Sequence, residues 1–538
     1  MDRSSDGFHR QTKYVSAIER MHQSSFFLAS LPWLALRLLQ RLFAFLLGIG
    51  LTACMVGPDY QRPNVALQKN WTSFTEKSSD TRPPSWWQQF DDARLQALLK
   101  TGRENSQSVQ TAALRILQAQ AQLGISTSAE LPTVQLLFSD TYTKPDLAQQ
   151  LQGKKGGSTT QQLNLQASWE PDLWGAIGRG VQSDEATWVS TVAAYQAAMV
   201  ALEANIATLY FNICTLNVRL QVANDNLLQQ EENKRIAHSR FRTGASSEQD
   251  LRQAQVLYEQ TRAHIPTLRA ALLQSQHALS VLLGKLPDYY QKTYRAAAPM
   301  PTIPLTIPTG IPRDLLQRRP DVLQAEYAAI AQSARIGQAK AALLPSFSLG
   351  GSFGFQSSNG GQNNLDDLLK WRNPITNMTA GLLFPIFNHG KLVNYVRVQD
   401  AVFQQAVLNY QTKVLSAQQE VEDALSAITG YREAVNSLRD ARTAARRSTT
   451  LALERYKAGA SDFTTVTTAY QAQLQVEDGL TQAHGNLLQS FVSAYRALGG
   501  GWDGTLNASL PDDITRQMRA RTQWGDALVL PNQQKITQ

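Results

Sequence analysis

The sequence predicts a mainly α-helical fold that also contributes β-strands to a membrane β-barrel, and three observations predict it. Two very long segments, 181–243 and 391–458, contain almost no glycine or proline. Four shorter segments alternate apolar and polar residues with a period of two. Both features occur twice along the chain, which indicates an internal two-fold sequence repeat.

Composition sets the first limits on function. Of the 538 residues, 43% are hydrophobic and only 17% are charged, and two are cysteines. That apolar content can bury a core, which excludes a chain disordered through charge. Two cysteines exclude a disulfide scaffold. The net charge of +8 is spread without a dense run of lysine or arginine, so no nucleic-acid partner is expected.

The first 53 residues have the features of a signal peptide. An apolar run at 42–53 follows Arg41 and ends in Leu-Thr-Ala before Cys54. It is too short for a membrane-spanning helix. The run resembles a bacterial lipobox, which implies cleavage before Cys54 and a covalent lipid on its thiol. Met55 rather than aspartate follows, which favours the outer membrane. Met21 is an alternative start, and an ordinary buried cysteine is the alternative for Cys54.

The repeat divides the mature chain. The segment Arg240–Ser246 recurs as Arg455–Ser461, and Gly284 recurs as Gly499 with the same spacing along the sequence. Seven prolines between the two copies cannot lie in regular helix. The expected parts are an N-terminal segment and equatorial region at 54–105, a first repeat at 106–284, a Pro-rich crossover at 285–320, a second repeat at 321–499 and a C-terminal equatorial tail at 500–538.

Each repeat is expected to contain a helix, a strand pair and a long helical hairpin. The hairpins are predicted at 181–284 and 391–499, with kinks at Pro266 and at the pair Gly479 and Gly485. Helices of this length cannot be buried within one compact domain, so they indicate a bundle or a tube.

The strand pairs are predicted at 133–172 and 346–387. Strict alternation over about ten residues is typical of a barrel strand with one face toward lipid and one toward water. A half-buried soluble sheet has a similar pattern and remains an alternative. Four strands cannot close a barrel, and lipid offers no partner to an open edge. Two chains would supply eight strands and three would supply twelve. We infer a homotrimer with a twelve-stranded barrel, although a dimer satisfies the same count.

Several runs along the mature chain resemble one family in order. They are Cys54–Pro63, Trp86–Phe90, Glu170–Gly175, Arg318–Val322 with Glu326, and Ile336–Phe347. This set resembles the outer-membrane efflux factors, the TolC-like exit ducts, and in particular their NodT-type lipoproteins. The resemblance implies an outer-membrane barrel, a periplasmic α-helical barrel, a periplasmic adaptor protein and an inner-membrane pump, usually proton-driven.

The function implied by the resemblance is a passive exit duct for drugs or other small solutes. A duct for type I protein secretion and a non-conducting helical scaffold are the alternatives. No enzyme is expected: Ser352 matches a G-x-S-x-G motif, but it stands within a predicted strand. No cofactor or metal site is expected, since the histidines do not have metal-ligand spacing, and the lipid on Cys54 is the one predicted covalent group.

The turns of the two hairpins are the predicted adaptor contact. By resemblance they lie together at the periplasmic tip, where adaptor hairpins dock. The residues are Gly244, Ala245, Ser246, Gly459, Ala460 and Ser461. Each glycine also has a purely structural interpretation, because it permits a positive φ at a helix C-terminus.

The resemblance also implies a gate near these turns. Asp250 and Tyr456 match positions that link neighbouring helix pairs in the closed state, and we expect a hydrogen bond between them. Thr465 and Thr468 stand where aperture carboxylates are expected, and Asp462 is the nearest acid. A solvated position in the first turn of a helix is the alternative for Asp250.

Overall fold

The structure, a computed structural model of the whole chain, describes residues 55–66, 71–72, 86–144, 151, 156–303, 319–359, 365–368, 370, 374–500 and 510–528. Predictions for the signal peptide and for Cys54 therefore fall outside the described residues. The chain divides into two compact units. One contains Ala129–Arg179, Gly337–Val393 and the described residues 55–57, and the other contains the rest of the described chain.

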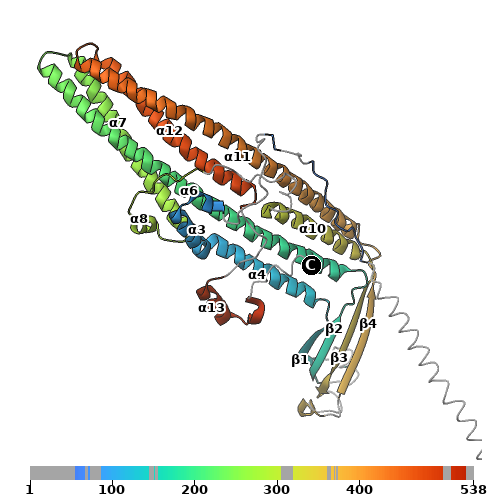
Figure 1. Cartoon of the computed structure of the whole chain (residues 1–538). Coiled ribbons are helices and arrows are strands. Elements are labelled where there is room, and N and C mark those ends of the chain that lie inside the picture. The colour runs from blue at the N-terminus through green and yellow to red at the C-terminus, as the bar shows by residue number, and fades with distance from the viewer. Residues whose placement is uncertain are drawn as a thin grey trace, which may run out of the picture. The chain divides into compact units, whose positions relative to one another are not determined.

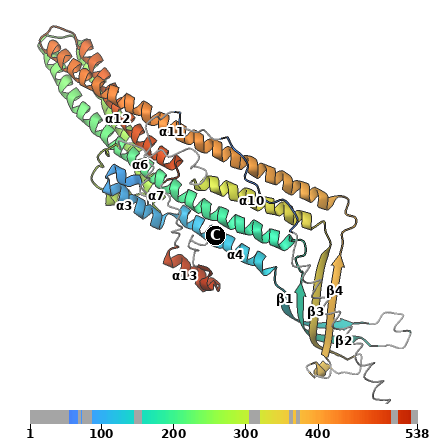
Figure 2. The ribbon, with the colours of Figure 1, turned by 45° about the vertical axis from the view of Figure 1, so that its right-hand side comes forward.

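The first unit is built around an antiparallel sheet in the order β1-β2-β3-β4. Its strands are β1 (Thr133–Thr143), β2 (Ser158–Trp169), β3 (Ser346–Ser358) and β4 (Pro374–Leu383), seen side by side in Figure 2. Leu165 in β2 lies opposite Leu136 in β1 and Phe353 in β3, so apolar positions of neighbouring strands share a face. Within the described chain, the outer edges of β1 and β4 pair with no further strand.

Large apolar side chains on this sheet are exposed. Leu136 is 70% exposed, Leu382 72% and Met378 88%. A sheet that packs on a core of its own chain would cover such side chains. Their exposure therefore indicates a partner outside the chain, either lipid or another protein surface.

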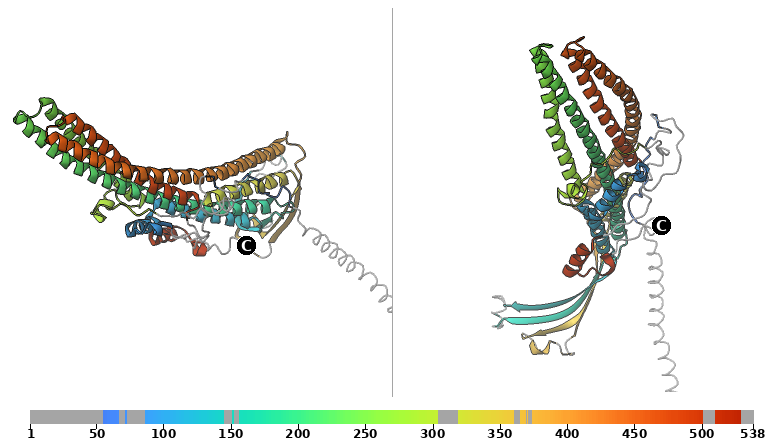
Figure 3. Two further views of the ribbon diagram at one scale, coloured as in Figure 1. Left: turned by 45° about the horizontal axis from the view of Figure 1, so that its top comes forward. Right: turned by 60° about the vertical axis from the view of Figure 1, so that its left-hand side comes forward.

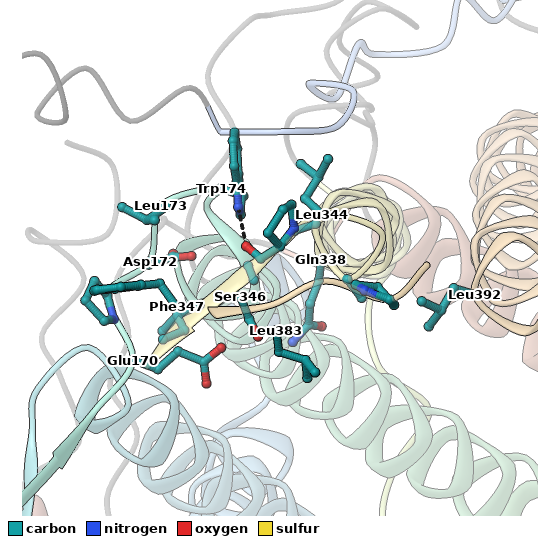
Figure 4. A pocket seen from close by; sticks show the side chains of 17 residues that line it. Glu170, Asp172, Leu173, Trp174, Gln338, Leu344, Ser346, Phe347, Leu383 and Leu392 are labelled. Carbon is teal, nitrogen blue, oxygen red and sulfur yellow. Dashed lines mark hydrogen bonds between the residues drawn. The ribbon is translucent and has the colours of Figure 1, made fainter. Parts of the chain in front are cut away.

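The segments that connect the strands to the helices surround a pocket of about 460 Å³, shown in Figure 4. Its lining is mainly apolar and includes Leu344, Phe347 and Leu383. The indole N–H of Trp174 donates to the carbonyl oxygen of Pro345 at 2.7 Å. This bond ties the segment that leaves β2 to the segment that enters β3.

The second unit consists mainly of two long helical hairpins (Figure 1). They are α6 (Ala176–Arg242) with α7 (Glu248–Leu282), and α11 (Lys391–Lys457) with α12 (Phe463–Ala497). The helices α6 and α11 begin in the first unit and have 67 residues each, while α7 and α12 have 35 each. Corresponding ends of the two hairpins keep one constant spacing along the sequence. Between the hairpins, α7 packs beside α12 (Figure 3).

Shorter elements make up the rest of the described structure. The helices α4 (Gln107–Ser128) and α10 (Pro320–Ala341) have 22 residues each and precede the two strand pairs. The others are η1 (Trp86–Phe90), α3 (Ala93–Asn105), α8 (Tyr289–Thr293), η3 (Leu365–Asp367), α13 (Asp512–Arg521) and η4 (Gly525–Leu528). The predicted mainly helical fold with a small sheet is confirmed.

The long helices continue through the residues expected to kink them. Pro266 lies inside α7, and Gly479 and Gly485 lie inside α12. At Gly485 a side chain would collide with α6, because an added Cβ would overlap Oγ1 of Thr215. Glycine there allows close approach of two helices. The kinks themselves stay predictions.

Of the four apolar clusters among the described residues, the two largest hold the long hairpin helices together. The larger cluster includes Phe211 and Phe491, and in it Trp86 stacks on Tyr495 at 5.1 Å between ring centroids. The fully buried Cys214 belongs to it. The smaller cluster, next to the hairpin turns, consists of Ala237, Ala254, Leu257, Ala452, Tyr456, Phe463, Val466, Ala469 and Tyr470.

Candidate functional site at the helical hairpin turns

Both hairpins turn through the same backbone motif. Gly244 and Gly459 have φ values of +73° and +75°. The N–H of Ala245 donates to the carbonyl of Arg240 at 2.8 Å, and the N–H of Ala460 donates to that of Arg455 at 2.9 Å. These bonds define a Schellman motif, in which glycine adopts the left-handed conformation after the last helical turn. The structural interpretation of both glycines is confirmed, and the alanine beside each is exposed.

The residues after each turn cap the returning helix. Ser247 accepts a hydrogen bond from the backbone N–H of Asp250 at 3.2 Å. Asp462 accepts from the backbone N–H of Thr465 at 3.2 Å and from its hydroxyl at 3.1 Å. Asp462 is thus the N-cap of α12 and is hydrogen-bonded to Thr465, one of the two predicted aperture residues. The hydroxyl of Thr468 donates to the carbonyl of Thr464 at 3.0 Å.

Arg240, at the end of α6, joins the two turns. Its guanidinium donates to the carbonyl oxygens of Lys457 at 2.8 Å and of Ala245 at 3.1 Å. It also lies over the ring of Tyr456, with 4.9 Å between its central carbon and the ring centroid, where a cation–π attraction is expected. Arg240 belongs to the repeated segment Arg240–Ser246, for which no such role is predicted above. The sequence does contain a signal for a role at the turns, because an arginine stands four positions before the glycine in both hairpins.

The predicted gate pair is not joined within the single chain. Tyr456 is buried between Arg240 and Phe463, and its ring centroid is 5.1 Å from that of Phe463. Its hydroxyl has no hydrogen-bond partner among the described residues. Asp250 is half-buried in the first turn of α7. Their hydrogen bond therefore stays a prediction for the assembled protein.

Polar side chains also link the hairpins farther from the turns. Arg219 in α6 makes a two-point ion pair with Asp478 in α12, at 2.6 and 3.0 Å. The buried Glu477 accepts from Arg446 in α11 at 2.6 Å and from Asn226 in α6 at 3.2 Å. These contacts tie three helices, and sequence reasoning had identified none of them.

The motif residues Arg319 and Asp321 form a buried clamp at the start of α10. Arg319 donates to Asp321 at 3.0 and 2.8 Å, to the carbonyl of Ala497 at 3.0 Å, and pairs with Glu420 at 2.8 Å. Burial opposes ionisation of Asp321, but the hydrogen bonds and charge of Arg319 outweigh it and lower the pKa of Asp321. The clamp joins the chain after the crossover to α11 and to the end of α12.

The N-terminal segment is fastened to α10 by a second ion pair. Arg62 donates to the two carboxylate oxygens of Glu326 at 2.5 and 2.6 Å. Glu326 is almost fully buried, while the side chain of Arg62 is half exposed. Such a bidentate pair fixes orientation as well as position. The segment that carried part of the family resemblance therefore has a structural role.

The residues directly after Cys54 are packed tightly in the first unit. The N–H of Val56 donates to the carbonyl of Trp174 at 3.1 Å. Gly57 has a φ of +117°, and an added Cβ there would overlap the Cα of Gly337. Two glycines therefore allow this backbone crossing. Cys54 itself lies outside the described residues.

Among the described residues, no group of three His, Cys, Asp or Glu side chains could hold a metal ion. Ser352 lies within β3, paired with Gln166 and Asn377 on the neighbouring strands. A nucleophile elbow needs a sharp turn into a helix instead.

Paired long hairpins, with a sheet whose outer edges are unpaired among the described residues, define a class of proteins whose subunits can close a barrel together. The family model described as outer membrane efflux protein matches residues 98–285 and 311–500. The chain belongs to this family. It is therefore an outer-membrane efflux protein.

Individual relatives agree over nearly their whole length. The pyoverdine export outer membrane protein OpmQ of Pseudomonas putida is 30% identical, over 85% of this chain and 96% of the relative. The cation efflux system protein CusC of Escherichia coli O6:H1 is 27% identical, over 86% and 99%. The solved outer-membrane channel OprN superposes with a TM-score of 0.78 at 28% identity, over 84% of this chain and 100% of that chain.

Proposed function

We propose that three copies of this chain form the outer-membrane exit duct of a tripartite efflux system. The duct passively conducts drugs or other small solutes that an inner-membrane pump delivers through a periplasmic adaptor. One observation carries the proposal: a sheet with two free edges and exposed apolar side chains continues into two 67-residue helices. Free edges are not tolerated in lipid, so such a sheet must close with copies of itself.

In this assembly twelve strands form the barrel and twelve long helices form the periplasmic tube. The matching lengths of the two hairpins and the constant spacing between their ends support a ring of six similar units from three chains. A soluble half-buried sheet is less well supported, since side chains such as Met378 are uncovered.

The solute is expected to depend on the pump. The named relatives export pyoverdine and cations respectively, which are chemically unlike each other. For this chain we propose a small solute of unspecified class. Protein secretion is the second possibility, which the family match leaves open in the same fold.

We further propose that Cys54 carries the lipid anchor. The apolar run and the lipobox-like Leu51–Cys54 support it, and the packed segment at 55–57 would hold the anchor point close to the start of α6 and the end of α10. Mass spectrometry of the mature N-terminus tests this. A diacylated Cys54 is the expected species, and an unmodified peptide spanning Ala53 and Cys54 from the membrane fraction contradicts the proposal.

Planar bilayer recording of the purified full-length protein tests the duct. Discrete single-channel conductance together with a trimeric native mass supports it. Trimers that insert into the bilayer without conducting would instead indicate a helical scaffold.

A further inference from the structure

We infer that Arg455 binds a second copy of this chain. Its guanidinium lies over the ring of Phe241 of the partner subunit and donates to the carbonyl oxygen of Arg242 of the partner subunit. This inference rests on the proposed trimer and adds to it a specific contact between hairpin turns. It follows from a contact that the two hairpins of one chain already make.

The template is the contact of Arg240 within the chain. Arg240 ends the first hairpin's long helix, lies over Tyr456 and donates to the carbonyl of Lys457 at 2.8 Å. Tyr456 and Lys457 end the second hairpin's long helix. An arginine of one turn thus binds an aromatic ring and a helix-end carbonyl of the next turn.

Each member of this contact has a counterpart at the equivalent position of the other hairpin. Arg240 corresponds to Arg455 and Tyr456 corresponds to Phe241. Lys457 corresponds to Arg242, the last residue of α6, whose carbonyl has the same place in the helix. The chain therefore contains the complete set twice, with an arginine, an aromatic ring and a helix-end carbonyl in each.

Within one chain only one of the two sets is used. The side chain of Arg455 is exposed and makes no hydrogen bond or ion pair with the described residues. Phe241 is 39% exposed, whereas its counterpart Tyr456 is 1% exposed. The unused arginine lies on the second hairpin and the uncovered ring on the first. They can meet only if the second hairpin of one copy lies beside the first hairpin of the next.

A closed ring provides that arrangement. In a cyclic trimer the hairpins alternate, so each first hairpin faces one second hairpin inside its chain and another across a subunit boundary. The two turns have the same backbone geometry. The same contact can therefore form at both boundaries.

A second contact follows the same relation. The hydroxyl of Thr464 in α12 donates to the side chain of Gln253 in α7 at 3.3 Å. Their counterparts are Gln249 and Thr468, which can also form a hydrogen bond, and both are exposed. We assign Thr468 to this boundary, facing Gln249 of the partner subunit.

Farther from the turns, one ion pair between the hairpins has no chemically matching counterpart at the equivalent positions. The ion pair of Arg219 with Asp478 has alanines, Ala434 and Ala263, as its counterparts. Contacts there differ between the two boundaries. The contacts assigned to both boundaries lie next to the hairpin turns, where six units would converge.

Thiol cross-linking in the full-length membrane protein tests the inference. The variant Arg242→Cys with Arg455→Cys is treated with a short bismaleimide. Its matched control is Arg240→Cys with Lys457→Cys, the same pair of positions inside one chain. Cys214 can stay in place, because its thiol is fully buried.

The test pair is expected to give products of two- and three-chain mass, whereas the control pair links within one chain and keeps the one-chain mass. Each single-cysteine variant should give neither product. If native mass shows trimers and the test pair still stays at one-chain mass, the Arg455 contact is wrong. If no variant is trimeric, the proposed trimer itself fails.

Discussion

At the scale of single residues, the hairpin turns depend on one side chain as well as on the glycines. Gly244 and Gly459 permit the backbone to turn, but Arg240 joins the two turns through two carbonyl oxygens and the ring of Tyr456. A guanidinium suits this place because it presents several donors in one plane and stacks on rings.

Replacement of Arg240 by alanine is predicted to loosen the turns. Loss of charged hydrogen bonds at a partly exposed site should lower local stability by about 1–2 kcal/mol. Hydrogen exchange of the amides at 240–246 and 455–461 is expected to become faster by the factor that this loss of local stability implies. Arg269→Ala, at an exposed position of α7 away from the turns, serves as control and should leave exchange unchanged. Equal protection in both variants would show that Arg240 does not hold the turns.

Replacement of Asp321 by asparagine is predicted to destabilise the chain in a pH-dependent way. The pKa of Asp321 lies below its usual 3.8 because Arg319 stabilises the carboxylate. The stabilisation is thus present at neutral pH and is lost as pH falls through the folded-state pKa. We expect the wild type to exceed Asp321→Asn in stability by about 1–2 kcal/mol at pH 7.

Thermal unfolding in detergent at neutral and acidic pH measures this difference. It should shrink below pH 3.8. A difference that stays constant on acidification would mean that the charge of Asp321 contributes nothing. The variant Asp423→Asn, on an exposed part of α11, controls for general effects of removing a carboxylate.

Residues that act on their own backbone could be predicted, and residues that act across the fold could not. Gly244 and Gly459 follow from the local rule that helices end in a left-handed residue. Arg240 and Glu477 act on groups of the other hairpin, as their bonds with Lys457 and Asn226 show. A single sequence gives no measure of which distant residues meet.

At the scale of elements, the lack of helix-breaking residues proved the strongest signal. Segments almost without glycine or proline became the 67-residue helices α6 and α11. The predicted kinks stay predictions: α7 contains Pro266 and α12 contains Gly485 without a break in the helix. Packing against α6 accounts for Gly485, a reason that only three-dimensional contacts reveal.

The turns are predicted to dock the adaptor as a pair. Ala245 and Ala460 are both exposed, so tryptophan at both positions should leave trimer abundance unchanged. It should abolish export, because the bulk blocks a close contact with the adaptor. Drug accumulation in cells that carry the double variant, with Leu228→Trp on the exposed face of α6 as control, provides the measurement. Normal export with tryptophan at both turns would rule out docking at this place.

At the scale of the whole molecule, the sheet and the hairpin turns both bear on how copies of the chain assemble. A sheet whose outer edges are unpaired among the described residues needs further copies in lipid, and in the proposed trimer those copies would bring the hairpin turns together. An outer-membrane duct must be closed at rest, so the converging turns are the place where a gate is needed. Hydrogen bonding of Tyr456 is then relevant to this gate, because its buried hydroxyl lacks a hydrogen-bond partner within the described chain.

In the trimer, the hydroxyl of Tyr456 either bonds to Asp250 or stays unpaired. If assembly brings Asp250 to Tyr456, the bond stabilises the closed state by roughly 1–3 kcal/mol at each of its occurrences, since the acceptor is charged. Tyr456→Phe and Asp250→Ala should then each raise single-channel conductance and sensitise cells to vancomycin. The double variant should do no more than either single one, because both remove the same bond. Wild-type conductance in Tyr456→Phe, with trimers intact, would show that the hydroxyl stays unpaired and that closure depends on other contacts, such as those of Arg240 and Arg455.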